Sequence, residues 1–217
     1  STAGLEAIAI GGEHVISPGT AFDPDDPLAA YLADGASFSS GPVAVRVAPA
    51  AGRRSVDRAE FIRAHLEHGA HGFVSEDSGD YVHDTEHVRL IVLDTNHPGG
   101  YYQGSIGQAQ LDWLDERIAE AGRQQRPVLV VTHHGQVAMD NTYGNEPDTD
   151  RRLGDAFAEV LHRHDNVVAW VVGHRHVHRI RPSLDPAGSG RGFWEITTSS
   201  TIDWPCQARV IEVVRGT

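Results

Sequence analysis

Three short apolar runs, separated by amphipathic stretches, constrain the fold of this chain more than any other feature. The runs cover residues 88–93, 127–132 and 167–172, and each has the length and the valine-rich composition of a buried central strand. Between them, residues 108–121 and 150–163 repeat their apolar side chains at helical spacing. This alternation predicts a layered α/β sandwich whose loops present polar groups at the strand ends.

The parts of the chain that flank these runs predict further elements. Residues 5–16 have the pattern of a hairpin around a glycine pair, whereas residues 17–52 show no sustained periodicity and are interpreted as a long surface excursion. A helix is expected over residues 55–68. Strands expected at residues 177–180, 192–198 and 208–214 follow one another closely, which favours antiparallel pairing.

Histidines directly follow two of the three apolar runs. His133 and His134 come after the second run, and Gly173-His174-Arg175-His176 comes after the third. Strand carboxyl ends are where open α/β sheets bind ligands, and histidine is the commonest metal ligand, so this placement favours a metal site over surface histidines near turns. If the second segment is extended, His174 and His176 share one face. Arg175 then points the other way and is not expected to clamp a phosphate.

Composition excludes several classes of function. The formal net charge of −12 disfavours general nucleic-acid binding, and the chain contains no lysine, which removes Schiff-base chemistry. The glycine motifs of serine hydrolases, nucleotide triphosphatases and dinucleotide-binding domains are also absent. No apolar run approaches the roughly 18 residues that a membrane-spanning helix needs.

The same histidine segments resemble a known family. Val130-Val131-Thr132-His133-His134 looks like the strand-then-histidine motif of the calcineurin-like metallophosphoesterases, and Gly173-His174-Arg175-His176 looks like their Gly-His-X-His motif. The resemblance covers residues 88–180 well, and residues 1–87 match poorly. It implies an α/β/β/α sandwich with mixed sheets.

The resemblance also implies a reaction and roles for individual residues. His133 and His174 would bind one metal ion and His176 a second, while His134 would lie behind the ligands or face the substrate. The two ions, which are manganese, iron or zinc, would hydrolyse a small phosphate mono- or diester. Asn141, in the loop beyond His133, is a further candidate to contact the substrate or to order the site, and Asp94 is a candidate to border the site.

The departure from the family is as informative as the match. In the calcineurin-like family, upstream Asp-X-His, Gly-Asp and Gly-Asn-His motifs supply the bridging carboxylate and the other ligands. These motifs do not occur in this sequence. Residues 1–217 are therefore expected to form a single domain that is incomplete at its N-terminus, with the missing N-terminal half as its partner. The cellular location stays open, export included, because a targeting signal would lie on that segment.

Two other functions stay open on the sequence alone. The chain could be a non-catalytic metal-binding or degenerate domain, which keeps the histidines without the bridging carboxylates. It could also be a mononuclear zinc hydrolase in which three histidines leave one position for water.

Overall fold

The computed structural model describes residues 8–10, 14–18, 36–40, 43–47, 58–68, 79–98, 102–142, 150–202 and 206–214. The backbone falls into two compact units, Ser1–Ala64 and His65–Thr217, and each is considered by itself. The expectation of one domain that is incomplete at its N-terminus stays a prediction.

The first unit contains a four-stranded antiparallel sheet. Its strands follow the order β1-β2-β3-β4 and comprise β1 (Ile8–Ile10), β2 (His14–Pro18), β3 (Ala36–Ser40) and β4 (Val43–Val47). The predicted hairpin is confirmed as β1 and β2. The interpretation of residues 17–52 as a surface excursion is wrong for β3 and β4, because Val43-Ala44-Val45-Arg46-Val47 offers the β-branched residues that a strand prefers.

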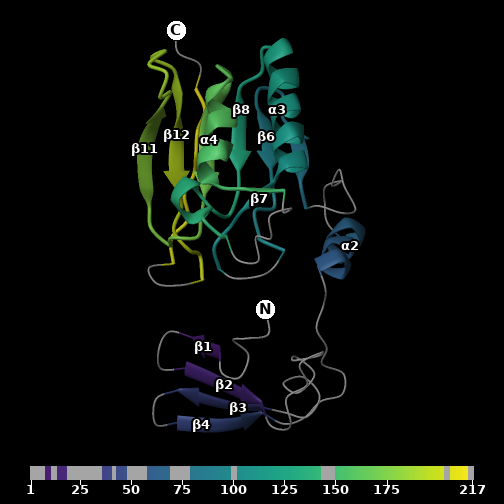
Figure 1. Ribbon diagram of the computed structural model, residues 1–217, viewed down its shortest axis with the longest axis vertical. Coiled ribbons are helices and arrows are strands. Elements are labelled where there is room, and N and C mark those ends of the chain that lie inside the picture. The colour runs from purple at the N-terminus through teal and green to yellow at the C-terminus, as the bar shows by residue number, and fades with distance from the viewer. Residues whose placement is uncertain are drawn as a thin grey trace. The chain divides into compact units, whose positions relative to one another are not determined.

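The second unit is built on a six-stranded mixed sheet of order β11-β12-β10-β8-β6-β5 (Figure 1). Its strands are β5 (Tyr81–Asp84), β6 (Arg89–Val92), β8 (Val128–Val131), β10 (Val167–Val172), β11 (Arg179–Leu184) and β12 (Gly192–Thr197). The four inner strands are parallel, whereas β5 and β11 pair antiparallel at the two edges. The predicted α/β class with a mixed sheet is confirmed. The strand expected at residues 208–214 is wrong, because this segment forms no regular element.

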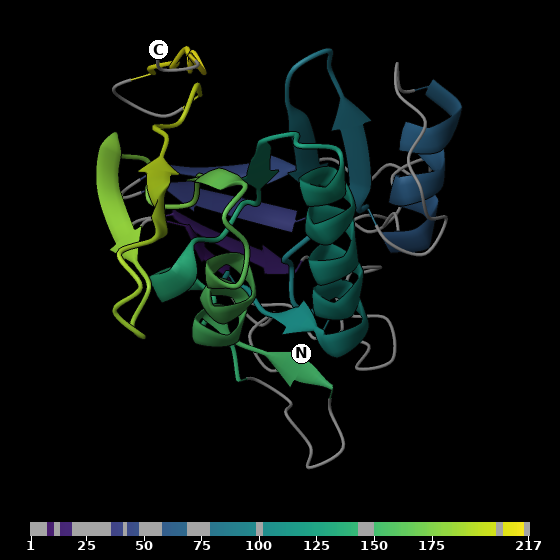
Figure 2. The same ribbon diagram turned by 90° about the horizontal axis from the view of Figure 1, so that it is seen from above.

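Helices α3 (Gln108–Arg123) and α4 (Gly154–His162) cover the same face of this sheet (Figure 2). Both were predicted, as was α2 (Arg58–His68) before them. The core under α4 contains a stacked pair, Phe157 and Trp170, whose ring centroids are 4.5 Å apart. Burial of a side chain of this size stabilises the fold by about 1.5–3 kcal/mol. No helix in the described part of the chain is long and apolar enough to span a bilayer.

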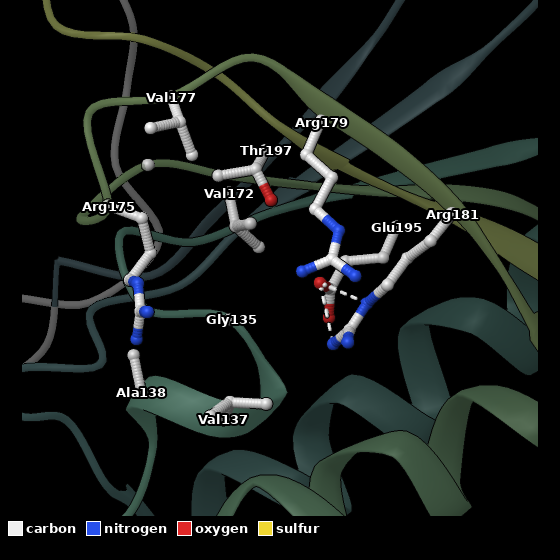
Figure 3. A pocket seen from close by; sticks show the side chains of 11 residues that line it. Gly135, Val137, Ala138, Val172, Arg175, Val177, Arg179, Arg181, Glu195 and Thr197 are labelled. Carbon is white, nitrogen blue, oxygen red and sulfur yellow. Dashed lines mark hydrogen bonds and ion pairs between the residues drawn. The ribbon is translucent and has the colours of Figure 1, made fainter.

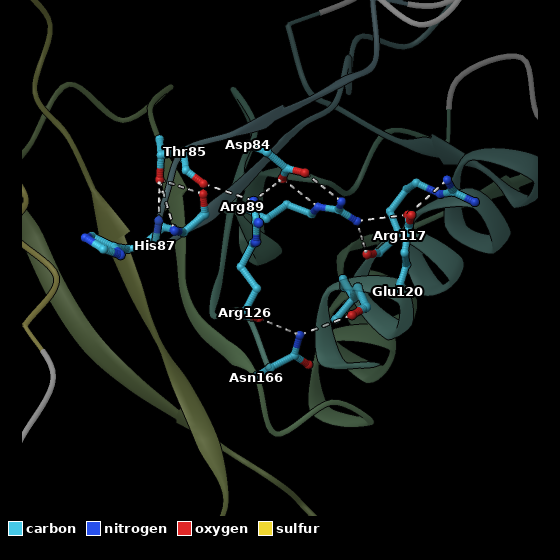
Figure 4. Close-up of polar contacts among 10 residues, drawn as sticks. Asp84, Thr85, His87, Arg89, Arg117, Glu120, Arg126 and Asn166 are labelled. Atoms are coloured by element: carbon cyan, nitrogen blue, oxygen red, sulfur yellow. Dashed lines mark hydrogen bonds and ion pairs between the residues drawn. The ribbon is translucent and has the colours of Figure 1, made fainter. Parts of the chain in front are cut away.

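The amino-terminal end of β6 contains a buried arginine in a polar network (Figure 4). The Arg89 guanidinium is 5% exposed and donates to both carboxylate oxygens of Asp84 at 2.8 Å and to Glu120 at 3.0 Å. These hydrogen bonds hold the pKa of the Asp84 carboxyl below its usual value. The network holds β5, β6 and α3 together at the amino-terminal end of β6, which is the end of the sheet opposite the histidines.

We expect Arg89→Met to lower the free energy of unfolding by about 3 kcal/mol, because several hydrogen bonds to charged groups are lost at once. Urea unfolding followed by circular dichroism measures the change. Arg152→Met is the matched control, since Arg152 is 44% exposed and its carboxylate partner Asp150 lies 3.8 Å away. A shift no larger for Arg89→Met than for this control would show that the network does not stabilise the fold.

Candidate metal centre

Three histidines meet at the carboxyl ends of β8 and β10. Each of His133, His134 and His174 contributes one ring nitrogen, and these three nitrogens all lie within 4.8 Å of one another. His174 Nδ1 lies 3.3 Å from His133 Nε2. Two imidazole nitrogens bound to one tetrahedral zinc at about 2.05 Å are themselves about 3.3 Å apart. The spacing of His133 and His174 therefore fits two ligands of one ion.

His134 has a different environment from the other two. It is 2% exposed, its Nε2 lies 3.0 Å from the Tyr102 carbonyl, and its Nδ1 lies 2.8 Å from the Thr95 hydroxyl. A carbonyl can only accept, so Nε2 carries the proton and Nδ1 accepts from Thr95. The His134 ring packs 4.7 Å from the His133 ring and 4.8 Å from the His174 ring, measured between centroids. Its geometry supports its neighbours, and its expected catalytic role stays a prediction.

Burial of His134 makes the stability of the fold depend on pH. Burial lowers its pKa from 6.5 to about 4, so between these values the unfolded chain takes up a proton that the folded chain does not. The contribution of this residue is complete above pH 6.5 and is lost as the pH falls towards 4, by about 3 kcal/mol in total. Urea unfolding between pH 7.5 and 4.5 is expected to show a steeper loss for the wild type than for His134→Asn. Equal slopes in the two proteins would contradict this account.

The segment after β10 is a tight turn. His174 has φ 67° and the Arg175 N–H donates to the Gly173 carbonyl at 2.7 Å, which closes a three-residue turn around the histidine. His176 also has a positive φ, of 51°. The expectation of an extended segment, with His174 and His176 on one face and Arg175 opposite, is therefore wrong. Such backbone is costly for a non-glycine residue and is typical of functional sites.

His176 lies outside the group of three histidines that come within 4.8 Å of one another. It is exposed, and its charge acts on both His133 and His174, so it lies near them. Its assignment to a second metal ion stays a prediction.

A second set of contacts holds the strand ends in place. The Thr132 hydroxyl donates to the His134 carbonyl at 2.7 Å and accepts from the Trp170 indole at 2.8 Å. The Gly173 N–H donates to the His133 carbonyl at 3.0 Å, which ties the end of β10 to the end of β8. Partners of this kind orient metal ligands and keep a site rigid.

Asn141 is buried and binds the loop that faces His134. Its side-chain amide donates to the Gln103 carbonyl at 2.9 Å, and its backbone N–H donates to the Gly104 carbonyl at 3.0 Å. The same loop presents the Tyr102 carbonyl to His134. These contacts give Asn141 a positioning function, and the contact with substrate that was expected for it stays a prediction.

Burial is the main factor that favours neutral imidazoles in the cluster. Burial, and then the charge of neighbouring residues, lowers the pKa of both His133 and His174. At neutral pH their nitrogen lone pairs are therefore available to a metal ion. Among the described residues the cluster itself contains only histidines, although the negative charges of Asp94 and Asp140 reach His134 and His174 respectively.

Sequence reasoning missed three residues on which the cluster depends: Thr95, Tyr102 and Gly104. Thr95 carried a usable signal, since it stands two residues after a predicted strand, where site residues gather. Gly104 is close to His134, because a Cβ at position 104 would lie 2.4 Å from the Cγ of that ring. Gly173 is less crowded, since a Cβ at that position would make only an ordinary contact, at 3.5 Å from His133 Nδ1.

No family model matches the chain. A Synechococcus protein described as a probable cyclic nucleotide phosphodiesterase is 32% identical over 98 residues, which is 45% of this chain and 36% of that protein. The chain thus spans about a third of the length of the curated relative that it matches. A dimetal phosphatase from Danio rerio superposes with a TM-score of 0.45 at 17% identity, over 65% of this chain and 57% of that one. Over 98 residues the chain thus resembles a probable phosphodiesterase, in line with the resemblance of its histidine motifs to the metallophosphoesterases.

Proposed function

We propose that this chain supplies the histidine ligands of a metal-dependent phosphoesterase, which hydrolyses small phosphate mono- or diesters at a dinuclear centre. The observation that carries the proposal is the 3.3 Å approach of His133 Nε2 to His174 Nδ1 at the ends of two adjacent parallel strands. The similarity to a probable cyclic nucleotide phosphodiesterase supports the same class of reaction.

Two metal ions bound here would attract the phosphoryl oxygens and activate water for attack on phosphorus. The chain itself contributes fixed ligands, since neutral His133 and His174 direct nitrogens at one point. His134 is held by Thr95 and Tyr102, and it keeps the other two rings from turning away. His176 is proposed to hold the second ion. Imidazole ligands suit manganese, iron or zinc, so the ions are proposed only as this group.

Hydrolysis assays on the full protein that contains this chain test the proposal. The protein is loaded in turn with manganese, iron and zinc and assayed with bis(4-nitrophenyl) phosphate, 4-nitrophenyl phosphate and 4-nitrophenyl acetate. We expect metal-dependent release of nitrophenol from at least one phosphate ester and its loss on treatment with a chelator. Hydrolysis of the acetate alone would instead favour the mononuclear zinc hydrolase.

A second candidate is a non-catalytic metal-binding module, which the all-histidine composition of the cluster in the described residues favours. In that case the protein binds metal tightly and hydrolyses none of the three esters. The same assay series, with the metal content measured in parallel, therefore separates the two functions.

A further inference from the structure

A small basic pocket is lined in part by the two chain segments that carry the histidine cluster. Figure 3 shows the side chains that line it. It has a volume of about 140 Å³ and lies between the turn after β8, the turn after β10, and strands β11 and β12. Gly135 and Gly173 line it, and these two residues directly adjoin His134 and His174. The pocket is therefore continuous in sequence with both segments that carry the proposed ligands.

Three guanidinium groups line this pocket, together with one carboxylate. Arg181 is paired with Glu195, since its Nε and Nη2 lie 2.9 and 2.8 Å from Oε1. Glu195 is 7% exposed, and its Oε2 also accepts from the Gln136 N–H at 3.4 Å. The carboxylate thus neutralises one arginine and is held in place.

Arg175 and Arg179 supply a surplus of two positive charges. No carboxylate of the described residues lies within ion-pair distance of either group, and both side chains are exposed. Figure 3 shows Arg175 on one side of the pocket and Arg179 on the other, beside Arg181 and Glu195. A local surplus of this kind is unusual in a chain with a formal net charge of −12, and it attracts anions.

The remaining lining limits the shape of a ligand. Val137, Val172 and Val177 form apolar walls, and the volume is below the roughly 300 Å³ of a pocket for a whole drug-sized molecule. The pocket therefore fits one carboxylate or phosphate group on a short arm. Arginine is the residue best suited to either anion, because its planar fork can bind two oxygens at once.

We infer that this pocket binds a second anionic group of the substrate, a carboxylate or a phosphate, while the ester to be hydrolysed lies at the histidine cluster. The assignment of the bound anion to a substrate rests on the proposed phosphoesterase function. The existence of the anion site does not depend on that function. The preferred substrates are then phosphate esters that carry a further negative charge on the leaving group. The two arginines are specificity-determining residues.

The first test measures anion binding without catalysis. Pyrophosphate is titrated calorimetrically into metal-free protein, from which the chelator has been dialysed away. We expect Arg175→Gln and Arg179→Gln each to weaken binding about tenfold, which is the loss of one charge-assisted contact. Arg191→Gln is the matched control, because Arg191 is 48% exposed and pairs with Asp165 outside the pocket. Its affinity is expected to equal that of the wild type.

The second test measures substrate selectivity. The kcat/KM value for an aryl phosphodiester with a carboxylate on the leaving group is compared with that for its uncharged methyl ester. We expect the wild type to prefer the charged ester about tenfold and Arg179→Gln to lose the preference. A phosphate in place of the carboxylate shows which of the two anions is favoured.

The outcomes separate this inference from the proposed function. Pyrophosphate binding that depends on both arginines, without hydrolysis of any ester, would support the anion site and contradict the phosphoesterase. Hydrolysis with unchanged binding and selectivity in both variants would overturn the anion site and leave the phosphoesterase standing. Because both side chains are exposed, neither substitution removes a core contact, and circular dichroism checks that the variants fold.

Discussion

Replacement of His174 by alanine is expected to lower kcat/KM for bis(4-nitrophenyl) phosphate more than about 100-fold, since loss even of a residue that only supports a ligand costs 10–100-fold. His174 Nδ1 lies 3.3 Å from His133 Nε2, so its removal leaves His133 without the second nitrogen of the proposed metal site. Addition of metal ions in excess is expected to restore part of the rate. The dependence of the rate on metal concentration measures the lost affinity.

His87→Ala is the matched control for this substitution. The His87 side chain is 81% exposed and lies next to Glu86 at the turn between β5 and β6, at the opposite end of the sheet from the carboxyl ends of β8 and β10. Its kcat/KM is expected to match the wild type. An equal loss in both variants, or an unchanged rate in His174→Ala, would contradict the role given to His174.

Replacement of Gly104 by alanine is expected to disrupt the site by displacing His134, against which the new Cβ would clash. The new Cβ would lie 2.4 Å from the Cγ and 2.8 Å from the Cβ of His134, and neither atom belongs to a flexible end that can move aside. Either the His134 ring or the loop that faces it must shift. We expect the free energy of unfolding to fall by about 2 kcal/mol, as in other overpacked cores. Metal affinity is expected to fall with it, because His134 packs against both His133 and His174.

Gly79→Ala serves as the control for this change. A Cβ at Gly79 would meet only the Cβ of Asp94, at an ordinary 3.7 Å, so stability and metal affinity are expected to stay near those of the wild type. Urea unfolding and calorimetric metal titration measure both quantities. Wild-type metal affinity in Gly104→Ala would show that the position of His134 does not matter to the site.

The central sheet was predictable because its strands are short, apolar and separated by clear helices. The strands β6, β8 and β10 and helices α3 and α4 fall where periodicity placed them. Strands β3 and β4 were missed, because the surrounding prolines and glycines of residues 17–52 conceal two five-residue runs. Periodicity and propensity favour a strand, but the strand forms only where a partner strand is available for pairing.

Residues 208–214 show the opposite error. Val210, Ile211 and Val213 suggest a strand, but Val210 is 95% exposed and the segment pairs with no strand. Within the six-stranded sheet, the position next to β12 is already occupied by the edge strand β11. The composition of a strand was present, and the pairing that would have stabilised it was not.

Part of the site was predictable, because open α/β sheets bind ligands at the carboxyl ends of their strands. This rule predicted that His133 and His174 lie close together, and their ring nitrogens are 3.3 Å apart. The positive φ of His174 was not predictable, because a histidine adopts such backbone only when the surrounding structure imposes it. The pairing of His134 with Thr95 and Tyr102 was also not predictable, since they lie 39 and 32 residues away along the chain. The position of Thr95 just after a predicted strand marked it only as a candidate site residue.

Metal content per chain tests the central claim most directly. The full protein is purified, dialysed and analysed for manganese, iron and zinc by elemental analysis, in parallel with His174→Ala and His87→Ala. The proposed dinuclear centre predicts about two ions per chain in the wild type and in His87→Ala, and a clear loss in His174→Ala. Wild-type protein that binds no metal, or that keeps its full content in His174→Ala, would contradict the assignment of this histidine cluster as a metal centre.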